Sequence, residues 1–394
     1  MHIDAAGGRR LDVARVEVSA MEPSLTSSPA AYGDPRTVAA LRAYADLRAG
    51  RPIRIAEGRR AIVAIAIDGL GEAQHATFVA RVAGGPMALA LAGRRAERLG
   101  LVHGETVATL VPVEETAERA VLSAIASSET PPPVVGASLG GRAELAAVEL
   151  AKLAGLLPAM LVAPARDTIL NGTEAGLLEV DADAALGLRR HVAGTIRRVS
   201  SARVPIAADI DTRFVVYRDA LGSQSIAVIV GDPDPSRPVP IRIHSSCATG
   251  DIFGSRRCDC GDQLQLALER IDELGSGAVL YMDQEGRGLG LANKMRAYEL
   301  QDRGLDTVDA NTALGYHEDE RDYTAATRIL ADLGWKSILL LTNNPAKVDA
   351  LREAGIEVAD RLPVLAPVNA ENRRYLEVKA ARSGHLLEHI RGGH

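Results

Sequence analysis

The three cysteines of the chain lie close together, in the segment CATGDIFGSRRCDC, as Cys247, Cys258 and Cys260. A structural zinc knuckle usually has four ligands, whereas three thiolates leave one position open for water. That arrangement is typical of a hydrolytic centre, because zinc lowers the pKa of its bound water towards neutrality. Buried thiols that act as small apolar side chains are the alternative. His244, just before the segment, is either a fourth ligand or a neighbour of the site.

A glycine-rich segment, DQEGRGLGLANK, is a second candidate site. Gly286, Gly288 and Gly290 follow an apolar run and precede a helical pattern. The N-terminus of a helix favours anions, so this segment and its Arg287 suit a phosphate. The spacing differs from the dinucleotide-binding fingerprint, and a plain turn fits the pattern equally well.

Further polar residues stand where strands are expected to end. In LTNNPAK, Thr342 and Lys347 flank Pro345, which suits a first helical turn. Lys294 and Tyr298 are four residues apart and share one face of a predicted helix. A single lysine or arginine is most often a solvated surface charge. Several at the carboxyl ends of strands favour a phosphorylated ligand.

The segment HEDERDYT places Asp319 and Arg321 on either side of Glu320. Acidic residues are favoured in the first turn of a helix, and a helical pattern follows directly. The local sequence supports a charged helix start and a catalytic acid–arginine pair equally.

Alternating strands and helices must position these residues. After two strands over residues 214–220 and 225–231, the pattern predicts strands at 241–246, 278–283 and 337–342 and helices at 262–275, 291–304 and 345–355. Such alternation predicts an α/β unit whose sheet is at least partly parallel.

The first half of the chain is expected to form a separate domain. Residues 1–34 are rich in small residues and predict a flexible arm. Helices are expected at 35–50, 142–155 and 181–198, and strands at 61–67, 87–92 and 159–165. A break near residue 205 divides the rest into an α/β domain over 35–204 and a second domain over 205–394.

The composition narrows the classes of protein. With 47% hydrophobic and 24% charged residues the chain is globular, and a net charge of −6 with 3% aromatics argues against nucleic-acid binding. No apolar run has membrane-spanning length, and the first residues lack the apolar core of a secretory signal. The chain has three cysteines, an odd number and too few for a disulfide framework, which favours a reducing compartment. We therefore expect a cytoplasmic protein that binds no membrane.

Four segments, in order along the chain, resemble GTP cyclohydrolase II over about residues 205–390: RIHSSCATGDIFGSRRCDCG, YMDQEGRGLGLANKMRAYELQDRGLDTVDAN, LGYHEDERDYT and LLTNNPAKV. The resemblance implies a hydrolase acting on a cyclic amidine in the first step of riboflavin biosynthesis. GTP would give formate, pyrophosphate and 2,5-diamino-6-(5-phosphoribosylamino)pyrimidin-4(3H)-one. Zinc would serve the ring opening, Mg²⁺ would accompany the triphosphate, and the protein would be a homodimer.

The resemblance also implies roles for individual residues. Zinc falls on Cys247, Cys258 and Cys260; the proton acceptor is Asp319, the proposed nucleophile is Arg321, and Tyr298 serves ring opening. The implied GTP contacts are Arg242, Ile243, His244, Ser245, Ser246, Gln263, Glu285, Gly286, Arg287, Thr307, Thr342 and Lys347. We expect Arg321 to stabilise the transition state, because an arginine pKa stays above about 12. Ser246 departs from the family, which usually has Glu there.

The first half resembles 3,4-dihydroxy-2-butanone-4-phosphate synthase, through the segment RAELAAVELAKLAGLLPAMLVAPARD. That family binds Mg²⁺ through a dense acidic run and a loop that contains histidine. Here the region offers only Glu57 and Asp68, and LGGRAELAA contains no histidine. Divalent cations need several oxygen ligands, so the sequence predicts a degenerate synthase domain retained for folding or dimerisation.

Two rival functions remain. A variant cyclohydrolase could stop at the formamidopyrimidine product without releasing formate, and Tyr298 argues against it. A GTP-binding regulatory module without turnover is the other, and the intact cysteines, Asp319 and Arg321 argue against that.

Overall fold

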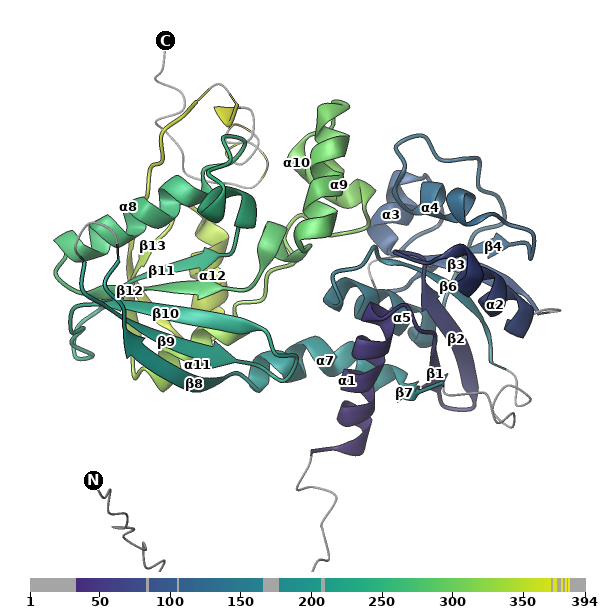
Figure 1. Cartoon of the computed structure of the whole chain (residues 1–394), viewed down its shortest axis with the longest axis horizontal. Helices are drawn as coiled ribbons and strands as arrows, with labels where there is room; N and C mark the ends of the chain where they lie inside the picture. Colours follow the sequence, from purple (N-terminus) through teal and green to yellow (C-terminus); the bar gives the residue numbers. More distant parts are fainter. Residues whose placement is uncertain are drawn as a thin grey trace, which may run out of the picture. The chain divides into compact units, whose positions relative to one another are not determined.

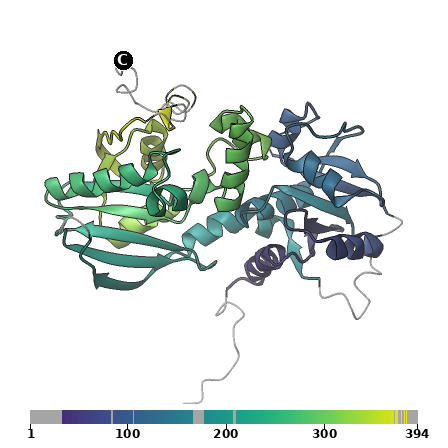
Figure 2. The same cartoon turned by 45° about the horizontal axis from the view of Figure 1, so that its top comes forward.

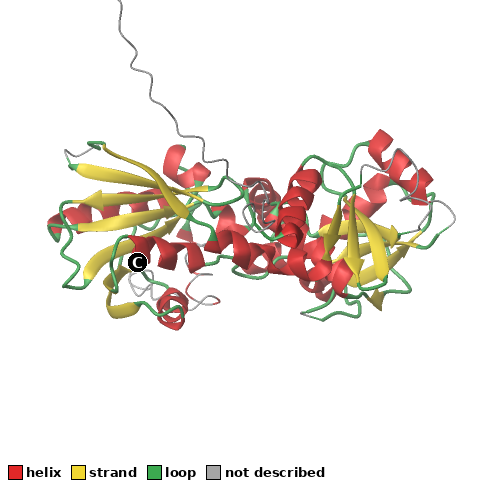
Figure 3. Ribbon diagram, turned by 90° about the horizontal axis from the view of Figure 1, so that it is seen from below, coloured by secondary structure: helices red, strands yellow, loops and turns green. Residues whose placement is uncertain are grey.

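Two seven-stranded sheets organise the chain in the computed structural model, each with helices on both faces (Figures 1 and 3). The structure describes residues 33–82, 85–104, 106–165, 177–206, 210–369, 371–373, 377, 380 and 382. Both sheets belong to one compact unit that begins at Arg36. The α/β class predicted from the sequence is therefore confirmed. The predicted arm, residues 1–34, lies outside the described residues except for its last two.

The first sheet has the strand order β5-β4-β3-β6-β2-β1-β7, and all its neighbours are antiparallel except β1 and β7. Its strands are β1 (Ile53–Glu57), β2 (Arg60–Ala66), β3 (Met87–Leu91), β4 (Thr109–Val113), β5 (Ser138–Leu139), β6 (Ala159–Pro164) and β7 (Glu179–Asp181). The accompanying helices are α1 (Pro35–Arg48), α2 (Glu72–Val82), α3 (Gly93–Arg98), α4 (Arg119–Ser127), α5 (Arg142–Leu153) and α7 (Ala182–Gly194).

The second sheet has the order β14-β13-β11-β12-β10-β9-β8. Its strands are β8 (Arg197–Arg203), β9 (Thr212–Arg218), β10 (Gln224–Val230), β11 (Val239–Ser245), β12 (Gly277–Met282), β13 (Ser337–Leu341) and β14 (Glu357–Leu362). Its helices are α8 (Cys260–Glu273), α9 (Leu291–Asp302), α10 (Thr307–Ala313), α11 (Thr324–Asp332) and α12 (Pro345–Glu353), with short turns η3 (Ala248–Ile252) and η4 (Glu285–Gly288).

The second sheet is parallel on one side and antiparallel on the other. β11 runs parallel to β12 and β13, and β13 runs parallel to β14. β12, β10, β9 and β8 pair antiparallel. The partly parallel sheet predicted from the alternating pattern is confirmed, and the strands named in that prediction form its centre.

Alternation along the strands builds a core on each face of a sheet. In β2, Ile62 and Ala64 pack with α1, α5 and α7, whereas Val63 and Ile65 pack with α2 and α4. Successive side chains of a strand point to opposite faces, so one apolar run serves both layers. In the second sheet, α8 covers one face and α11 and α12 cover the other, as Figures 1 and 2 show.

One predicted helix is partly wrong. A helix was expected over residues 181–198, but α7 ends at Gly194 and residues 197–203 form β8, which pairs with β9. Every residue of β8 is exposed, and its sequence RRVSSAR accordingly needs no apolar face. The apolar alternation that predicts a strand is therefore absent from it. The second sheet thus begins shortly before residue 205, and the division into domains stays a prediction.

None of the helices in the described part of the chain combines the length and the apolar character needed to cross a membrane.

Candidate active site

A pocket lies where the central parallel strands of the second sheet end. Ser246 and Cys247 follow β11, Glu285 follows β12, and Thr342 follows β13. Ligands of open α/β sheets bind beyond the carboxyl ends of such strands. The pocket is a cleft that opens to solvent, and the space inside it, open solvent included, is about 1020 Å³. It is lined by Arg242, His244, Ser245, Ser246, Cys247, Cys258, Cys260, Gln263, Glu285, Gly286, Arg287, Leu289, Lys294, Ala297, Tyr298, Gln301, Thr307, Asn311, Arg321, Thr342, Asn343, Asn344 and Lys347.

The three cysteines converge at one end of this pocket. Their Sγ atoms lie within 4.8 Å of one another, and those of Cys247 and Cys258 are 3.8 Å apart. Gly250, in the turn η3, allows this approach, because a Cβ there would lie 2.9 Å from the Cys258 sulfur. The loop therefore folds its thiols into one cluster without a disulfide.

The cluster fits zinc by its donor chemistry. Hydrogen bonds from Cys258 and Cys260 lower the pKa of the Cys247 thiol, whereas contact with Cys247 raises the pKa of Cys258. Neighbouring thiolates repel one another, so a cation is needed for all three to ionise, and zinc prefers such sulfur ligands. His244 is not part of the cluster.

A buried carboxylate, Asp251, holds the start of the segment 247–260, which carries the three cysteines and is called the cysteine loop below. It accepts hydrogen bonds from the Cys247 backbone N–H and the Tyr281 hydroxyl, each at 2.9 Å, and contacts His244 Nε2 at 3.2 Å. Burial lowers the pKa of His244 although Asp251 favours its charged form. The His244 ring also stacks on Tyr281, and both rings pack around Asp251, which holds the cysteine loop.

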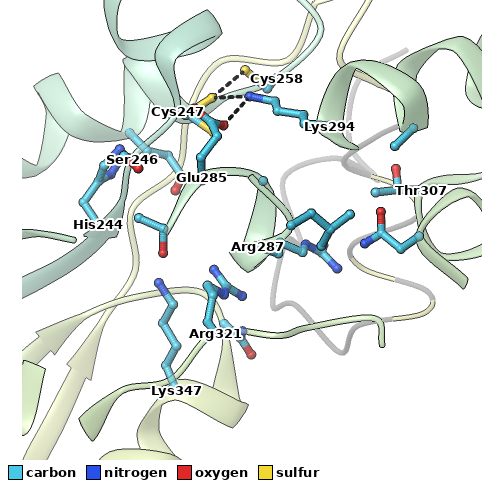
Figure 4. Close-up of a pocket in the computed structure, with 18 of the residues that line it drawn as sticks. His244, Ser246, Cys247, Cys258, Glu285, Arg287, Lys294, Thr307, Arg321 and Lys347 are labelled. Atoms are coloured by element: carbon cyan, nitrogen blue, oxygen red, sulfur yellow. Dashed lines mark hydrogen bonds and ion pairs between the residues drawn. The ribbon is translucent and has the colours of Figure 1, made fainter. Parts of the chain in front are cut away.

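Lys294 joins the cysteine loop to the segment after β12 (Figure 4). Its Nζ lies 3.0 Å from Cys247 Sγ, 2.8 Å from Thr249 Oγ1 and 2.9 Å from Glu285 Oε1. The other oxygen of Glu285 accepts the Ala248 N–H at 2.6 Å. Glu285, expected from the sequence to contact GTP, thus uses both carboxylate oxygens within the protein.

The glycine-rich segment turns sharply at η4. Arg287 has a φ of 62°, the one positive value outside glycine in the described residues, and Gly286 has 63°. Few non-glycine residues adopt this region, and those that do are often at functional sites. Gly288 packs against the backbone of Glu320, where a Cβ would lie 3.1 Å from its carbonyl carbon. The segment therefore contacts the chain that carries Asp319 and Arg321.

Asp319 and Arg321 form an ion pair beside the pocket. Arg321 Nε donates to Asp319 Oδ1 at 2.8 Å, and a second guanidinium nitrogen bonds the other oxygen. Burial would raise the pKa of Asp319, but its hydrogen bond and charge interaction with Arg321 lower it overall. Arg321 lines the pocket and Asp319 does not, so the acid lies behind the arginine.

Cationic side chains dominate the lining of the pocket. Arg242 donates to the Leu341 carbonyl at 2.9 Å, and Lys347 Nζ donates to the Ile243 carbonyl at 3.0 Å. Arg287, Lys294 and Arg321 complete the set, against Glu285 as the carboxylate in the described lining. Figure 4 shows Lys347 and Arg321 at the end away from the sulfurs. A polyanion could thus reach cations while its other end meets the thiols.

Helix α9 and the residue after β11 complete the lining. The Tyr298 ring lies under Arg257, whose guanidinium carbon is 4.4 Å from the ring centre. Thr307 is the first residue of α10. The Ser246 hydroxyl accepts the Gln284 N–H at 3.2 Å, so this shorter side chain bonds the backbone after β12.

The pocket brings together the predicted site residues with two exceptions. The Ile243 side chain lies in the core and Asp319 stands behind Arg321. Lys294, noted in the sequence beside Tyr298 but given no role there, also lines the pocket. The lining residues that the sequence did not single out are Leu289, Ala297, Gln301, Asn311, Asn343 and Asn344. Asn343 and Asn344 belong to the LTNNPAK junction, which was a usable signal, whereas Asn311 stands alone and gave none.

The fold and the pocket define an α/β protein with a three-cysteine cluster at one end of a pocket lined by cationic side chains. Residues 197–363 match the family described as GTP cyclohydrolase II. A "GTP cyclohydrolase-2" of Azospirillum brasilense is 42% identical over 366 residues, covering 88% of this chain and 93% of the relative. One from Xylella fastidiosa is 37% identical, covering 91% and 90%. The chain belongs to the GTP cyclohydrolase II family.

A further relative covers less of the chain. "Riboflavin biosynthesis protein RibBA" of Bacillus cereus is 42% identical over 254 residues, which is 61% of this chain and 64% of that protein.

The geometry of the cysteines predicts the metal content of the protein. We expect about one zinc ion per chain and its loss in Cys258→Ser, since two thiolates bind zinc far more weakly than three. The measurement is elemental analysis of purified, dialysed protein. Zinc retained at the wild-type level in Cys258→Ser would contradict the assignment, and Arg270→Ala, on the exposed side of α8, is the matched control.

Proposed function

We propose that this protein is a zinc-dependent GTP cyclohydrolase II that converts GTP to formate, pyrophosphate and 2,5-diamino-6-(5-phosphoribosylamino)pyrimidin-4(3H)-one in riboflavin biosynthesis. The observation that carries the proposal is a single pocket with three thiols at one end and Arg321 and Lys347 at the other. A purine with a triphosphate has the matching polarity. The names of the relatives support the same reaction.

Cys247, Cys258 and Cys260 would hold the zinc. When bound, zinc supplies a water of lowered pKa, the nucleophile that opening of the purine ring requires. The cysteine loop is held in place by the hydrogen bonds of Lys294, Glu285 and Asp251 described above.

Tyr298 and Arg321 would act on different bonds. The Tyr298 hydroxyl is a titratable group for proton transfer at the purine ring. Arg321 would stabilise the charge that develops as pyrophosphate leaves, because a planar guanidinium matches phosphate oxygens. Asp319 holds that guanidinium by two hydrogen bonds and thereby orients it.

The triphosphate would lie among Arg242, Arg287, Arg321 and Lys347. Mg²⁺ would arrive with it, since that ion is usually bound by substrate phosphates and one or two carboxylates. Apart from the cysteines, no group of three acidic, histidine or cysteine ligands gathers in the described residues.

The first half of the chain would not act as a synthase. Two of its acids have partners within the protein: Glu144 pairs with Arg60 and accepts the Gly141 N–H at 2.8 Å, and Glu57 accepts the Ala143 N–H at 3.2 Å. A divalent cation needs several oxygen ligands together, and these two carboxylates bond to the protein instead.

The proposed reaction is tested with purified full-length protein, GTP and Mg²⁺. Formate, pyrophosphate and the diaminopyrimidine should form in equal amounts. Pyrophosphate without formate would instead identify the variant that stops at the formamidopyrimidine, and binding of GTP without any product would identify the regulatory module.

Variants separate the two halves of the chemistry. Tyr298→Phe removes one proton-transferring group and should lower formate release by roughly 10²–10⁴-fold while pyrophosphate release survives better. Arg321→Ala should lower pyrophosphate release by roughly 10²–10³-fold, and Arg321→Lys should restore little. Both products are quantified in parallel for each variant.

Loss of both products to the same degree in Tyr298→Phe, together with normal pyrophosphate release in Arg321→Ala, would refute this division of roles. The pH profile gives an independent readout. Asp319 must be ionised to orient Arg321, and Arg321 lowers its pKa, so the acidic limb of the wild-type profile should lie below the usual range of a carboxyl group and should be lost in Asp319→Asn.

The predicted absence of synthase activity is tested separately. The pure protein with ribulose 5-phosphate and Mg²⁺ should give no dihydroxybutanone phosphate, because Glu57 and Glu144 bond to internal partners. Metal-dependent formation of that product would overturn the interpretation, and an active synthase assayed in parallel shows that the assay works.

A further inference from the structure

The first half of the chain contacts the elements that carry the proposed active site. Leu157, directly before β6, belongs to one apolar cluster with Leu289, Ala297 and Leu300 from around α9 and with Ala313 from α10. Helix α9 also carries Lys294 and Tyr298. The same apolar cluster thus holds a residue of the first half and the helix that lines the pocket.

Hydrogen bonds and an ion pair also join the first half of the chain to α9 and to the segment after α10. Arg296 of α9 pairs with Asp68, which also accepts the Leu157 N–H at 2.9 Å. The Tyr316 hydroxyl donates to the Leu156 carbonyl at 2.6 Å. These bonds tie two positions that precede Asp319 and Arg321, namely Arg296 and Tyr316, to the first half of the chain.

Arg95, on α3 of the first half, is a fully buried cation that bonds carbonyl oxygens. It donates to Ala313 at the end of α10 at 2.9 Å, and to Ile125 and Ser128 at the end of α4 at 2.8 and 2.7 Å. Burial, and to a lesser extent Arg98, lowers the pKa of Arg95 to about 10, so it stays charged at neutral pH. A cation is favoured at helix C-termini, and here one guanidinium serves two.

Gly315 lets the two halves approach closely. Its φ is 86°, and a Cβ there would lie 2.8 Å from the Pro158 side chain and 3.3 Å from that of Ala92. A larger residue would push the following segment, residues 316–321, away from the first half.

Lys152 contacts the residue that stands between the two members of the proposed catalytic pair. Its Nζ lies 3.2 Å from Glu320 Oε1, with the two side chains only 4% and 10% exposed. The same oxygen accepts the His317 N–H at 2.9 Å, and the Glu320 N–H donates to the Arg287 carbonyl at 3.1 Å. Glu320 is therefore fixed through side chain and backbone, between Asp319 and Arg321.

We propose that the first half of the chain is a support for the cyclohydrolase site, with Lys152 as a positioning residue that acts through Glu320 on the Asp319–Arg321 pair. This inference rests on the proposed function. It assigns a use to the half of the chain that the sequence predicts to be a degenerate domain: this half places the ammonium of Lys152 and a packed apolar surface against residues 315–321.

The test compares single substitutions in the full-length protein. Lys152→Met should lower kcat for pyrophosphate release by about 10- to 100-fold with little change in KM, because misplacing a catalytic group by about 1 Å costs on the order of 10²-fold. Lys152→Arg should regain most of the rate. Glu149→Gln is the matched control, because it removes the other ion pair of Lys152, at 3.1 Å, and leaves Glu320 paired.

Hydrogen–deuterium exchange over residues 314–323 gives a readout that needs no turnover. Exchange there should rise in Lys152→Met and stay at the wild-type level in Glu149→Gln. If Lys152→Met does not fold, Glu320→Gln is measured in the same way and should show the same loss of kcat and gain in exchange.

Unchanged kcat and exchange in the folded Lys152→Met or Glu320→Gln variant would overturn the inference, as would equal losses in Glu149→Gln. A wild-type protein without GTP turnover would refute the proposed function alone, and the exchange comparison would still decide whether Lys152 fixes the segment.

Discussion

Parallel pairing of β11 with β12 on one side and with β13 on the other is the constraint on which the site depends. Parallel strands end at the same edge of a sheet, so the segments that follow them must meet there. Those segments carry the first cysteine, the glycine-rich turn and the Thr–Asn–Asn–Pro junction. Each is then held by local means: a turn around Gly250, a left-handed Arg287, and Asn344, which caps α12 through the Ala346 N–H.

Charge is distributed unevenly around this edge. The carboxylates near the thiols, Asp251 and Glu285, accept hydrogen bonds from backbone N–H groups of the cysteine loop. These hydrogen bonds within the protein stabilise the negative charge of the two carboxylates, whereas the cationic side chains line the pocket. A chain with a net charge of −6 thus presents a locally positive cavity, the condition that an anionic ligand requires.

Most residues of the predicted site gather in one pocket because the signals that single them out are local. Three cysteines in one short segment can only serve a few purposes, and alternating strands and helices bring strand ends together. Contacts between distant positions leave no such signal. Nothing near Lys152 points to Glu320, and nothing near Arg95 points to Ala313, because these partners meet only through tertiary packing. β8 was missed for a different reason: an exposed strand of polar residues has no apolar alternation.

The contacts of Leu157, Asp68 and the Leu156 carbonyl with the second half have a consequence for any fragment cut from this chain. A fragment that begins at β8 lacks Leu157 and also the hydrogen-bond partners of Arg296 and Tyr316. A buried polar group that loses its partner costs free energy, so the elements that line the pocket would be held less firmly in such a fragment. A protein for expression is therefore better cut to residues 36–394 than to the second sheet alone.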